Sequence, residues 1–407
     1  MEERGYDLLP WQGWPLRPFF FSRAALRKLS SQLTDALQSW AREAQTKSAG
    51  ELADELGLNG EALSALDFRQ AFQDPNFTGV LRPDGFLFPD HYTVVELNFG
   101  NGLMVSQAYA DLLADYHAGQ TLVGPDLEVP RPFEAYLDLL RGIAGEEPSL
   151  IGILACASEY ETIMSWEKRV GDMVRFGREL FEKRGWETVL LHEDDVEVSP
   201  GRKAVSKALQ RELDLIVPLT INTTFFDQPE LLRTRYRHWT GCRLGRTPFF
   251  SPLSALCVDK GTLPWVAPHL AGGSDFSVKI PATEPPSEER ARVFRLNKDE
   301  WVLKRAFDGK DTHVGCSTYG RVWNARLAYA LRAGGYVMQK YQPMSVTVIP
   351  VTPDGESIEW KEVSCEFSPF LVGNRFAGGI VRYAPKARGL IMSPPPDNMG
   401  LGVAVAV

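Results

Sequence analysis

Two pairs of polar residues, each separated by one position, have the residue types of a metal or phosphate site. The first pair is Arg82 and Asp84, and the second is Glu96 and Asn98. Side chains two positions apart on a strand point to the same face, so two paired strands would gather all four groups on one surface. Carboxylate and amide oxygens suit Mg²⁺, which bridges nucleotide phosphates. A guanidinium could neutralise a transferring phosphoryl group or an oxyanion.

The same four residues could instead form a surface hairpin with solvated side chains. The neighbours of Glu96 in the chain include four apolar residues, namely Val94, Val95, Leu97 and Phe99. This setting indicates a buried strand, and a carboxylate without a partner is costly to bury. The residues alone leave the functional and the solvated interpretation equally open.

A lysine followed by a glycine-containing loop is a second candidate for a phosphate site. Lys304 closes the apolar run that starts at Trp301, and the loop contains Gly309 and Gly315. Such loops let backbone N–H groups approach phosphate oxygens, and a lysine beside them can contact phosphate as a point charge. The segment is neither a Walker A motif nor a dinucleotide-binding fingerprint, and an ordinary turn with a surface lysine is the alternative.

Three further segments could contact a nucleotide. Gln339 and Tyr341 lie on a predicted strand over 336–341, whose backbone could pair with an adenine edge, although an ordinary edge strand is the commoner case. Arg382 follows a predicted buried strand and suits either a phosphate or a structural ion pair. Lys260 lies at the start of a predicted helix, where it could reach a phosphate or face solvent.

Composition and charge exclude several classes of protein. The chain has 407 residues, 44% of them hydrophobic, so we expect two or three packed subdomains. The formal net charge is −8 and no block of Lys and Arg stands out, which argues against nucleic-acid binding. The N-terminus does not resemble a signal peptide, and no apolar run approaches the roughly 18 residues of a membrane span. We therefore expect a soluble, cytoplasmic protein that binds no membrane.

The five cysteines offer little chemistry. They are scattered and form no CxxC pair, which argues against a disulfide framework and a structural zinc site. Cys156 ends a predicted strand and could be the nucleophile of a non-nucleotide α/β enzyme. A buried thiol is much the commoner case, so we assign it no role.

Hydrophobic periodicity predicts a mixed α/β chain. Residues 1–75 are predicted to be mostly helical, with a helix that starts after Ser22. The segment 148–218 alternates strand, helix and strand, which predicts a parallel sheet. Residues 281–290 are rich in Pro, Ser and Glu and predict a linker. We expect three units: helices plus the metal-site strands over 1–145, a parallel α/β subdomain over 146–280, and a nucleotide-binding segment over 281–407.

Individual elements follow from the same patterns. Further predicted helices cover 49–56, 105–117, 160–184 and 319–333. Further predicted strands cover 150–154, 188–192, 214–219, 301–304, 335–341, 345–351 and 401–407.

The order of the motifs resembles one family, the circularly permuted ATP-grasp ligases typified by glutathionylspermidine synthase. In that family an R-x-D pair precedes an E-x-N pair. Four motifs follow much later in the chain: a lysine before an apolar helix, a strand lysine before a glycine-rich lid, a Q-x-Y strand and a late arginine. The corresponding residues here, in the same order, are Arg82, Asp84, Glu96, Asn98, Lys260, Lys304, Gly309 to Gly315, Gln339, Tyr341 and Arg382. Each motif alone is common, and the ordered set is more specific.

The resemblance implies a circularly permuted ATP-grasp fold with a pre-ATP-grasp-like parallel α/β subdomain. It also implies an ATP-dependent ligase that forms an amide or peptide-like bond through an acyl-phosphate. Three groups of residues follow from it: Mg²⁺ ligands (Asp84, Glu96 and Asn98), ATP-binding residues (Lys260, Lys304, Gly309, Gly315, Gln339 and Tyr341) and catalytic arginines (Arg82 and Arg382). The partners would be small-molecule or peptide carboxylates and amines, and a homodimer is left open.

Two departures from the family concern the acceptor and the lid. The E-x-N pair is followed by Phe99 and Gly100 instead of an acidic or hydroxyl residue and a proline, and the lid carries Asp308 and Asp311. The chain also has no amidase module. Two alternatives remain open: a non-catalytic ATP-binding protein of the same fold, and a phosphotransferase that stops at the phosphorylated product.

Overall fold

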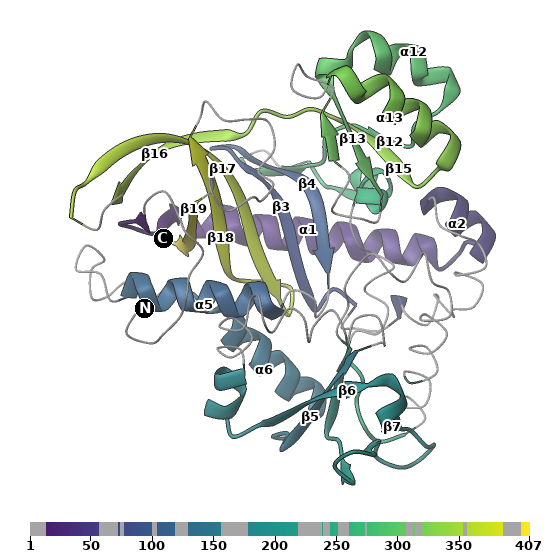
Figure 1. Cartoon of the computed structure of the whole chain (residues 1–407), viewed down its shortest axis with the longest axis vertical. Helices are drawn as coiled ribbons and strands as arrows, with labels where there is room; N and C mark the ends of the chain where they lie inside the picture. Colours follow the sequence, from purple (N-terminus) through teal and green to yellow (C-terminus); the bar gives the residue numbers. More distant parts are fainter. Residues whose placement is uncertain are drawn as a thin grey trace.

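The protein combines helices with one large curled sheet and three smaller sheets (Figure 1). This mixed α/β class is the one that the sequence predicts, while the ATP-grasp assignment and the permutation stay predictions. The computed structural model describes residues 14–56, 72–73, 77–99, 104–118, 129–155, 178–218, 238, 245–250, 260–272, 275–306, 312–314, 320–352, 356–385 and 400–407.

The large sheet joins segments from both ends of the chain. Its strand order is β11-β4-β3-β17-β18-β19-β2, with β16 beside β17 and β1 beside β16. Neighbours are antiparallel except β11 with β4 and β19 with β2. The strands are β1 (Trp14–Pro15), β2 (Phe19–Phe21), β3 (Val80–Leu87), β4 (His91–Phe99), β11 (Ser277–Lys279), β16 (Ser345–Thr352), β17 (Glu359–Val372), β18 (Arg375–Pro385) and β19 (Gly400–Ala406).

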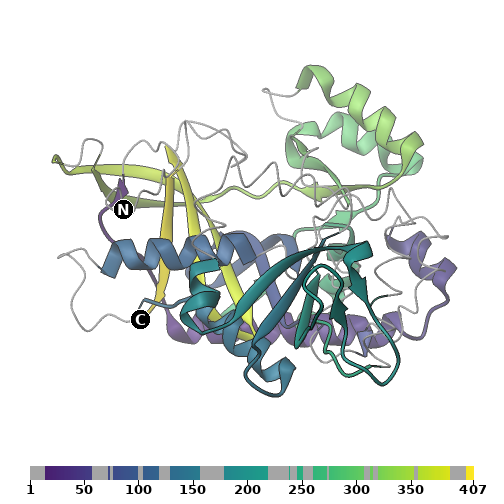
Figure 2. The same ribbon diagram turned by 60° about the horizontal axis from the view of Figure 1, so that its bottom comes forward.

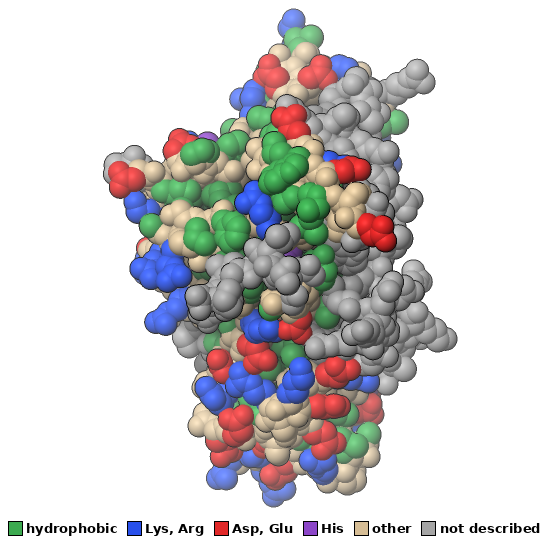
Figure 3. Space-filling model, turned by 90° about the vertical axis from the view of Figure 1, so that its left-hand side faces the viewer, with side chains coloured by type: hydrophobic (Ala, Val, Ile, Leu, Met, Phe, Trp, Pro, Cys, Tyr) green, Lys and Arg blue, Asp and Glu red, His purple; other side chains and the backbone are tan. Residues whose placement is uncertain are grey.

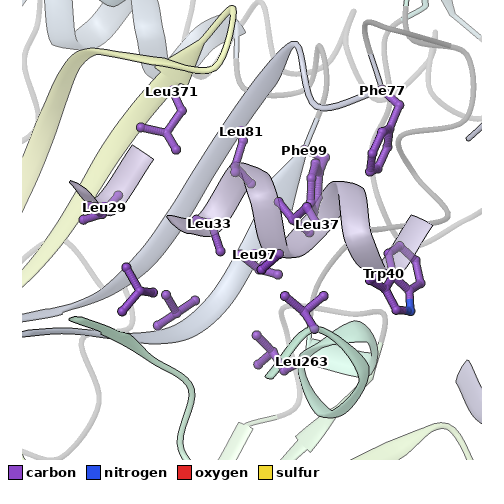
Figure 4. Packing of buried hydrophobic residues seen from close by; sticks show 14 of the residues in the cluster. Leu29, Leu33, Leu37, Trp40, Phe77, Leu81, Leu97, Phe99, Leu263 and Leu371 are labelled. Atoms are coloured by element: carbon purple, nitrogen blue, oxygen red, sulfur yellow. The ribbon is translucent and has the colours of Figure 1, made fainter. Parts of the chain in front are cut away.

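One face of this sheet packs on the long helix α1 (Arg23–Ala44). Ser22 caps the helix, because its side chain accepts a hydrogen bond from the backbone N–H of Ala25 at 3.4 Å. Apolar residues three or four positions apart form the buried stripe of the helix. Figure 4 shows this stripe against the sheet, with Leu29, Leu33, Leu37 and Trp40 facing Leu81, Leu97, Phe99 and Leu371.

The opposite face is covered at one end by α5 (Met104–Ala118) and α6 (Pro132–Ala144). Phe370 and Ile380 belong to the core on this side. The same core includes residues of a parallel sheet made of β10 (Leu215–Pro218), β5 (Leu150–Ala155) and β6 (Glu187–His192). The parallel pairing expected over 148–218 is therefore confirmed, and this unit comes forward in Figure 2.

A second, smaller layer carries the predicted nucleotide-binding lysine. It is a four-stranded sheet in the order β12-β15-β13-β14 that packs with α12 (Glu288–Leu296) and α13 (Gly320–Ala333) around Trp301 and Trp323. Its strands are β12 (Thr283–Glu284), β13 (Trp301–Arg305), β14 (Thr312–Val314) and β15 (Tyr336–Lys340). This unit lies at the top of Figure 1.

One prediction about the chain's organisation is wrong. Residues 281–290 are not a linker, because Thr283 pairs with Gln339 in the sheet and Ser287 caps helix α12. Pro, Ser and Glu there start a strand and a helix. The described part of 1–75 is mostly helical, as predicted, and the strands β1 and β2 precede the helix and pair with β16 and β19 from the other end of the chain. Such short strands are stabilised only by pairing with distant segments, so no pattern in the neighbouring sequence predicts them.

The remaining elements are short or agree with the predicted positions. Helix α2 (Ala49–Leu56) has the predicted bounds. The observed bounds of the further predicted strands lie within about two residues of the predicted ones. Of the helix predicted over 160–184, only residues 178–184 are described. Residues 178–183 are helical. No helix among the described residues is long and apolar enough to cross a membrane. The short elements are β7 (Val196–Glu197), β8 (Val205–Ser206), β9 (Arg211–Glu212), α11 (Leu263–Val266) and the 3-10 helices Glu193–Asp195, Lys260–Thr262, Ala267–His269 and Lys298–Glu300.

Candidate functional site

The two polar pairs of β3 and β4 do lie opposite one another. Asp84 pairs with Glu96 and Arg82 with Asn98 in the antiparallel register, so all four side chains share one face. A bulge follows Asp84, at Gly85. A Cβ at Gly85 would lie 2.1 Å from the backbone oxygen of Thr93, so only glycine fits this close approach.

Asp84 is the most strongly held of these groups. Its side chain is buried, and its two carboxylate oxygens accept hydrogen bonds from Nε and Nη2 of Arg82 at 2.9 and 3.1 Å. Arg382 donates to the same carboxylate at 3.1 Å and Asn98 at 3.2 Å. Although burial opposes ionisation, the two arginines hold the pKa of Asp84 at about 2. This carboxylate therefore fixes the positions of two guanidinium groups.

Glu366 is a member of the site that the sequence reasoning missed. It lies opposite Arg382 in the β17–β18 register, and Arg382 Nη1 donates to its carboxylate at 2.6 Å. Burial raises the pKa of Glu366 to about 7, and the nearby charges of Asp84 and Glu96 add to the rise while Arg382 opposes it. The signal was present: Glu366 stands between apolar neighbours, as Glu96 does, with Ser364 and Ser368 on the same face.

Lys260 lies against Glu96. Its Nζ lies 2.9 Å from Glu96 Oε1, and its side chain is 1% exposed, which makes it one of the largest fully buried side chains among the described residues. Burial opposes ionisation of Glu96, but the charge of Lys260 lowers the pKa of Glu96. The backbone N–H groups of Lys260 and Gly261 donate to the carbonyl of Ala306, which ties this segment to the end of β13.

Lys304 links the small sheet to the large one. Its ammonium donates to the backbone oxygen of Val95 on β4 at 3.1 Å and to Gln339 Oε1 on β15 at 2.8 Å. The amide of Gln339 donates in turn to the hydroxyl of Thr283 at 3.2 Å. The predicted strand lysine and the predicted glutamine therefore contact each other across β13 and β15.

The strand predicted over 336–341 is present as β15, and the alternative that it is an ordinary edge strand is wrong. Strand β15 lies between β12 and β13, so it is neither an ordinary edge strand nor free along its backbone. The N–H of Lys340 donates to Ala282 and that of Tyr341 to Glu300, each at 2.8 Å. These two donors are therefore not available to an adenine ring. A nucleotide contact by Tyr341 stays a prediction, whereas Gly309, Gly315 and Cys156 lie outside the described residues.

Nine residues from seven separate segments thus lie near one another, and we call this group the charged cluster. Its members are Arg82, Asp84, Glu96, Asn98, Lys260, Lys304, Gln339, Glu366 and Arg382. Four of them are cationic and three are carboxylates, so the cluster carries an excess of positive charge even with every carboxylate ionised. An anion bound here would be attracted by the four cations of the charged cluster.

The oxygen donors fit a magnesium ion only in part. No group of three or more His, Cys, Asp or Glu side chains within the described residues is arranged to hold a metal. Both oxygens of Asp84 accept hydrogen bonds from arginines, and Oδ2 accepts from Arg82, Asn98 and Arg382, so only Oδ1 keeps acceptor capacity for a metal ion. Glu96 and Asn98 suit the ion better, because Asn98 uses its amide nitrogen toward Asp84 and leaves its oxygen for a cation.

No model of a known protein family matches this chain. Comparison with curated protein sequences also finds no relative. Function is therefore inferred from the chemistry of the charged cluster.

Proposed function

We propose that the protein is an ATP-dependent ligase that joins a carboxylic acid to an amine, with an acyl-phosphate as the intermediate and ADP and phosphate as products. One observation supports this most strongly. Residues singled out from six distant motifs converge in the charged cluster, whose cations outnumber its carboxylates. A buried, hydrogen-bonded set of this composition suits the polyanionic phosphates of a nucleotide better than it suits a structural ion-pair network.

The cluster offers cations from two sides. Lys260 and Lys304 come from the region of the small sheet, and Arg82 and Arg382 from the large sheet. We assign the lysines to the phosphates that stay with ADP, because a lysine binds phosphate as a point charge without fixed geometry. The arginines are assigned to the transferred phosphoryl group, because planar guanidinium groups can donate two parallel hydrogen bonds to it.

The reaction has two steps in which the protein mainly positions groups and neutralises charge. A substrate carboxylate oxygen attacks the terminal phosphorus as the bond to ADP breaks. An amine nitrogen then attacks the acyl carbon, the bond to phosphate breaks, and the amine gives up a proton. Asp84 holds Arg82 and Arg382 ready for the charge that develops in both steps, so that the two guanidinium groups need little reorganisation.

A divalent cation fits this scheme at Glu96 and Asn98. Bound there, Mg²⁺ would neutralise part of the phosphate charge. Lys260 shares Glu96 with that site at 2.9 Å, so the lysine and the ion would act on the same phosphates. Asp84 would serve mainly to orient the arginines.

The first experiment is calorimetric titration of ATP with and without Mg²⁺. Micromolar binding that strengthens with Mg²⁺ supports the proposal, and no binding at millimolar ATP contradicts it. ADP release is then measured with a panel of carboxylic acids, with and without amines. Release that requires both substrates identifies a ligase, and release with acid alone identifies a phosphotransferase. Binding without ADP release under any condition identifies a non-catalytic ATP-binding protein.

Glu96→Gln is the sharpest test within the charged cluster. The substitution keeps the shape of the side chain but removes the charge that faces Lys260 and the cation. We expect loss of ATP turnover with an unchanged fold, measured by ADP release and circular dichroism. Full activity in this variant would show that Glu96 has no role in the reaction.

A further inference from the structure

A cavity of about 390 Å³ lies on the face of the large sheet opposite the charged cluster. Cys365 and Phe367 on β17 and Val381 on β18 line it, and they alternate along the strands with Glu366 and Arg382. Successive strand side chains point to opposite faces, so the cavity and the cluster lie back to back across the same two strands. The other described residues that line it are Arg17, Pro18, Phe19, Phe20, Phe21, Ser22, Ala25, Leu87, Phe88, Pro89, Phe276, Ser345, Val346, Thr347 and Ile349.

The walls of the cavity are mainly apolar, and aromatic rings are prominent among them. Six phenylalanines line it, and the rings of Phe21 and Phe367 lie 4.3 Å apart between centroids. Some of the apolar lining reaches the surface, since Phe20 is 41% and Val346 45% exposed. Hydrophobic side chains gather in the upper half of the face that Figure 3 shows, on the side where β16 lies, while charged side chains crowd its lower end.

Arg17 is the charged residue among the described residues that line the cavity. It is exposed, and its guanidinium carbon lies 6.0 Å from the centre of the Phe20 ring. The remaining polar side chains of the described lining are hydroxyls, on Ser22, Ser345 and Thr347. A ligand that matches these walls has an apolar, aromatic body and one negative charge.

The volume of the cavity limits the ligand to a small molecule. Ligand pockets span roughly 300–1,000 Å³, and they combine apolar walls with a few polar groups that fix orientation. A cavity of about 390 Å³ is at the small end of that range. Two fused rings with one carboxylate are of suitable size, whereas a nucleotide triphosphate is larger and more highly charged than this lining can match.

We propose that this cavity is a second binding site, which takes a small aromatic carboxylate. The rings pack among the phenylalanines, and the carboxylate lies toward Arg17. The site is separate from the charged cluster, so this inference stands whether or not the protein is a ligase.

The test compares three probes that share one ring system and differ in charge: 2-naphthoate, 2-naphthylmethanol and 2-naphthylmethylammonium. Each is titrated into the full-length protein and followed by calorimetry. We expect saturable binding of one molecule, tightest for 2-naphthoate, weaker for the alcohol and weakest for the ammonium compound. Equal affinity for all three probes, or no saturable binding of 2-naphthoate at millimolar concentration, would overturn the proposal.

Variants locate the binding. Ala25→Trp fills the cavity from helix α1, and we expect it to weaken 2-naphthoate binding at least about tenfold, because the bulky side chain occupies the ligand's volume. Arg17→Gln should weaken 2-naphthoate about fivefold while changing the alcohol less than about twofold, which is the effect of one exposed charge. Arg27→Gln is the matched control, because Arg27 is exposed on α1 outside the lining.

A second variant keeps the test decisive if Ala25→Trp does not fold. Thr347 is exposed on β16, so Thr347→Glu should leave the fold intact and place a negative charge at the wall. We expect weaker binding of 2-naphthoate and unchanged binding of the alcohol. If both Thr347→Glu and Arg17→Gln bind 2-naphthoate like the parent protein, the ligand lies elsewhere and the proposal is wrong.

Discussion

Strands β17 and β18 contribute to two regions with opposite chemistry. On one face Glu366 and Arg382 belong to the charged cluster, where buried charges are matched by hydrogen bonds. On the other face Phe367 and Val381 belong to the apolar core under α1 and to the wall of the cavity. Along each strand, alternate residues point to opposite faces, so one set of side chains forms the charged face and the other set forms the apolar face.

The difference separates two kinds of contribution. An apolar side chain contributes through area and fit, so its removal leaves a void and costs stability in proportion. A paired charge can contribute little net stability, yet removal of one partner leaves the other uncompensated in the interior. Substitutions on the charged face should therefore change ATP binding and pH dependence as well as stability, whereas substitutions on the apolar face should leave ATP binding unchanged.

Arg382→Met should have the largest effect. Among the residues that the structure describes, Arg382 is the cation that contacts both Glu366 and Asp84, and burial of these carboxylates without it is costly. We expect a loss of about 3–5 kcal/mol in the free energy of unfolding, measured by urea denaturation, together with loss of ATP binding.

Arg382→Lys is the matched control for this substitution. It keeps the charge but cannot reach both carboxylates with a planar fork, so stability should recover further than ATP binding does. An Arg382→Met protein as stable as the parent would show that the cluster is not held together by this arginine.

Phe367→Ala should rank second. The ring is 2% exposed and packs on Phe21 and Tyr92, so its removal should cost about 3 kcal/mol in unfolding free energy. The cavity already borders this ring, which places the cost at the low end for a buried phenylalanine. ATP affinity of the folded fraction should change less than about twofold, because the ring faces away from the cluster. A large loss of ATP affinity would mean that the two faces are coupled.

Much of the cluster could be predicted because its signals are local. Arg82, Asp84, Glu96 and Asn98 lie on two strands joined by a short turn, so spacing and the period of two fix their common face. Lys304 of β13 and Gln339 of β15 are separated in the chain by the short strand β14 and the helix α13. Helix α1 and the parallel unit also follow from periodicity.

What the sequence could not supply is the pairing of distant segments. Nothing local shows that Arg382 reaches Asp84 or that Lys260 reaches Glu96, since long-range strand order and a short 3-10 helix decide both. The strands β1 and β2 are too short to show a pattern of their own. Glu366 differs from these, because a polar residue within an apolar strand is a local signal from which the sequence could have predicted its place in the site.

Glu366→Gln should change the pH dependence of stability. The pKa of Glu366 is about 7 in the folded protein, above its ordinary value of 4.5, so the folded state keeps a proton that the unfolded chain loses. Stability contributed by this group therefore falls as pH rises from 4.5 to 7. The neutral glutamine removes this loss, and the variant should be more stable than the parent by about 1–3 kcal/mol at pH 8 and equal to it at pH 4.

The comparison must be made as a difference between variant and parent. Asp111 also has a pKa raised to about 7 by burial, so it contributes to the same pH window in both proteins and cancels in the difference. Urea denaturation of variant and parent at several pH values measures this difference in unfolding free energy. A constant difference across the range would show that the pKa of Glu366 is the same in the folded and the unfolded protein.

Lys304→Met should have the smallest effect on the fold and a selective effect on the ligand. The substitution keeps the apolar stem within β13 but removes the ammonium that bonds Val95 and Gln339. We expect ATP affinity to fall about tenfold, or about 1.4 kcal/mol, while 2-naphthoate binding on the other face stays unchanged. Lys279→Met, an exposed lysine on β11, is the control for loss of net charge. Equal losses of ATP affinity in both variants would show that Lys304 acts on ATP only through long-range electrostatic attraction. Unchanged ATP affinity in both variants would show that Lys304 is not part of the nucleotide site.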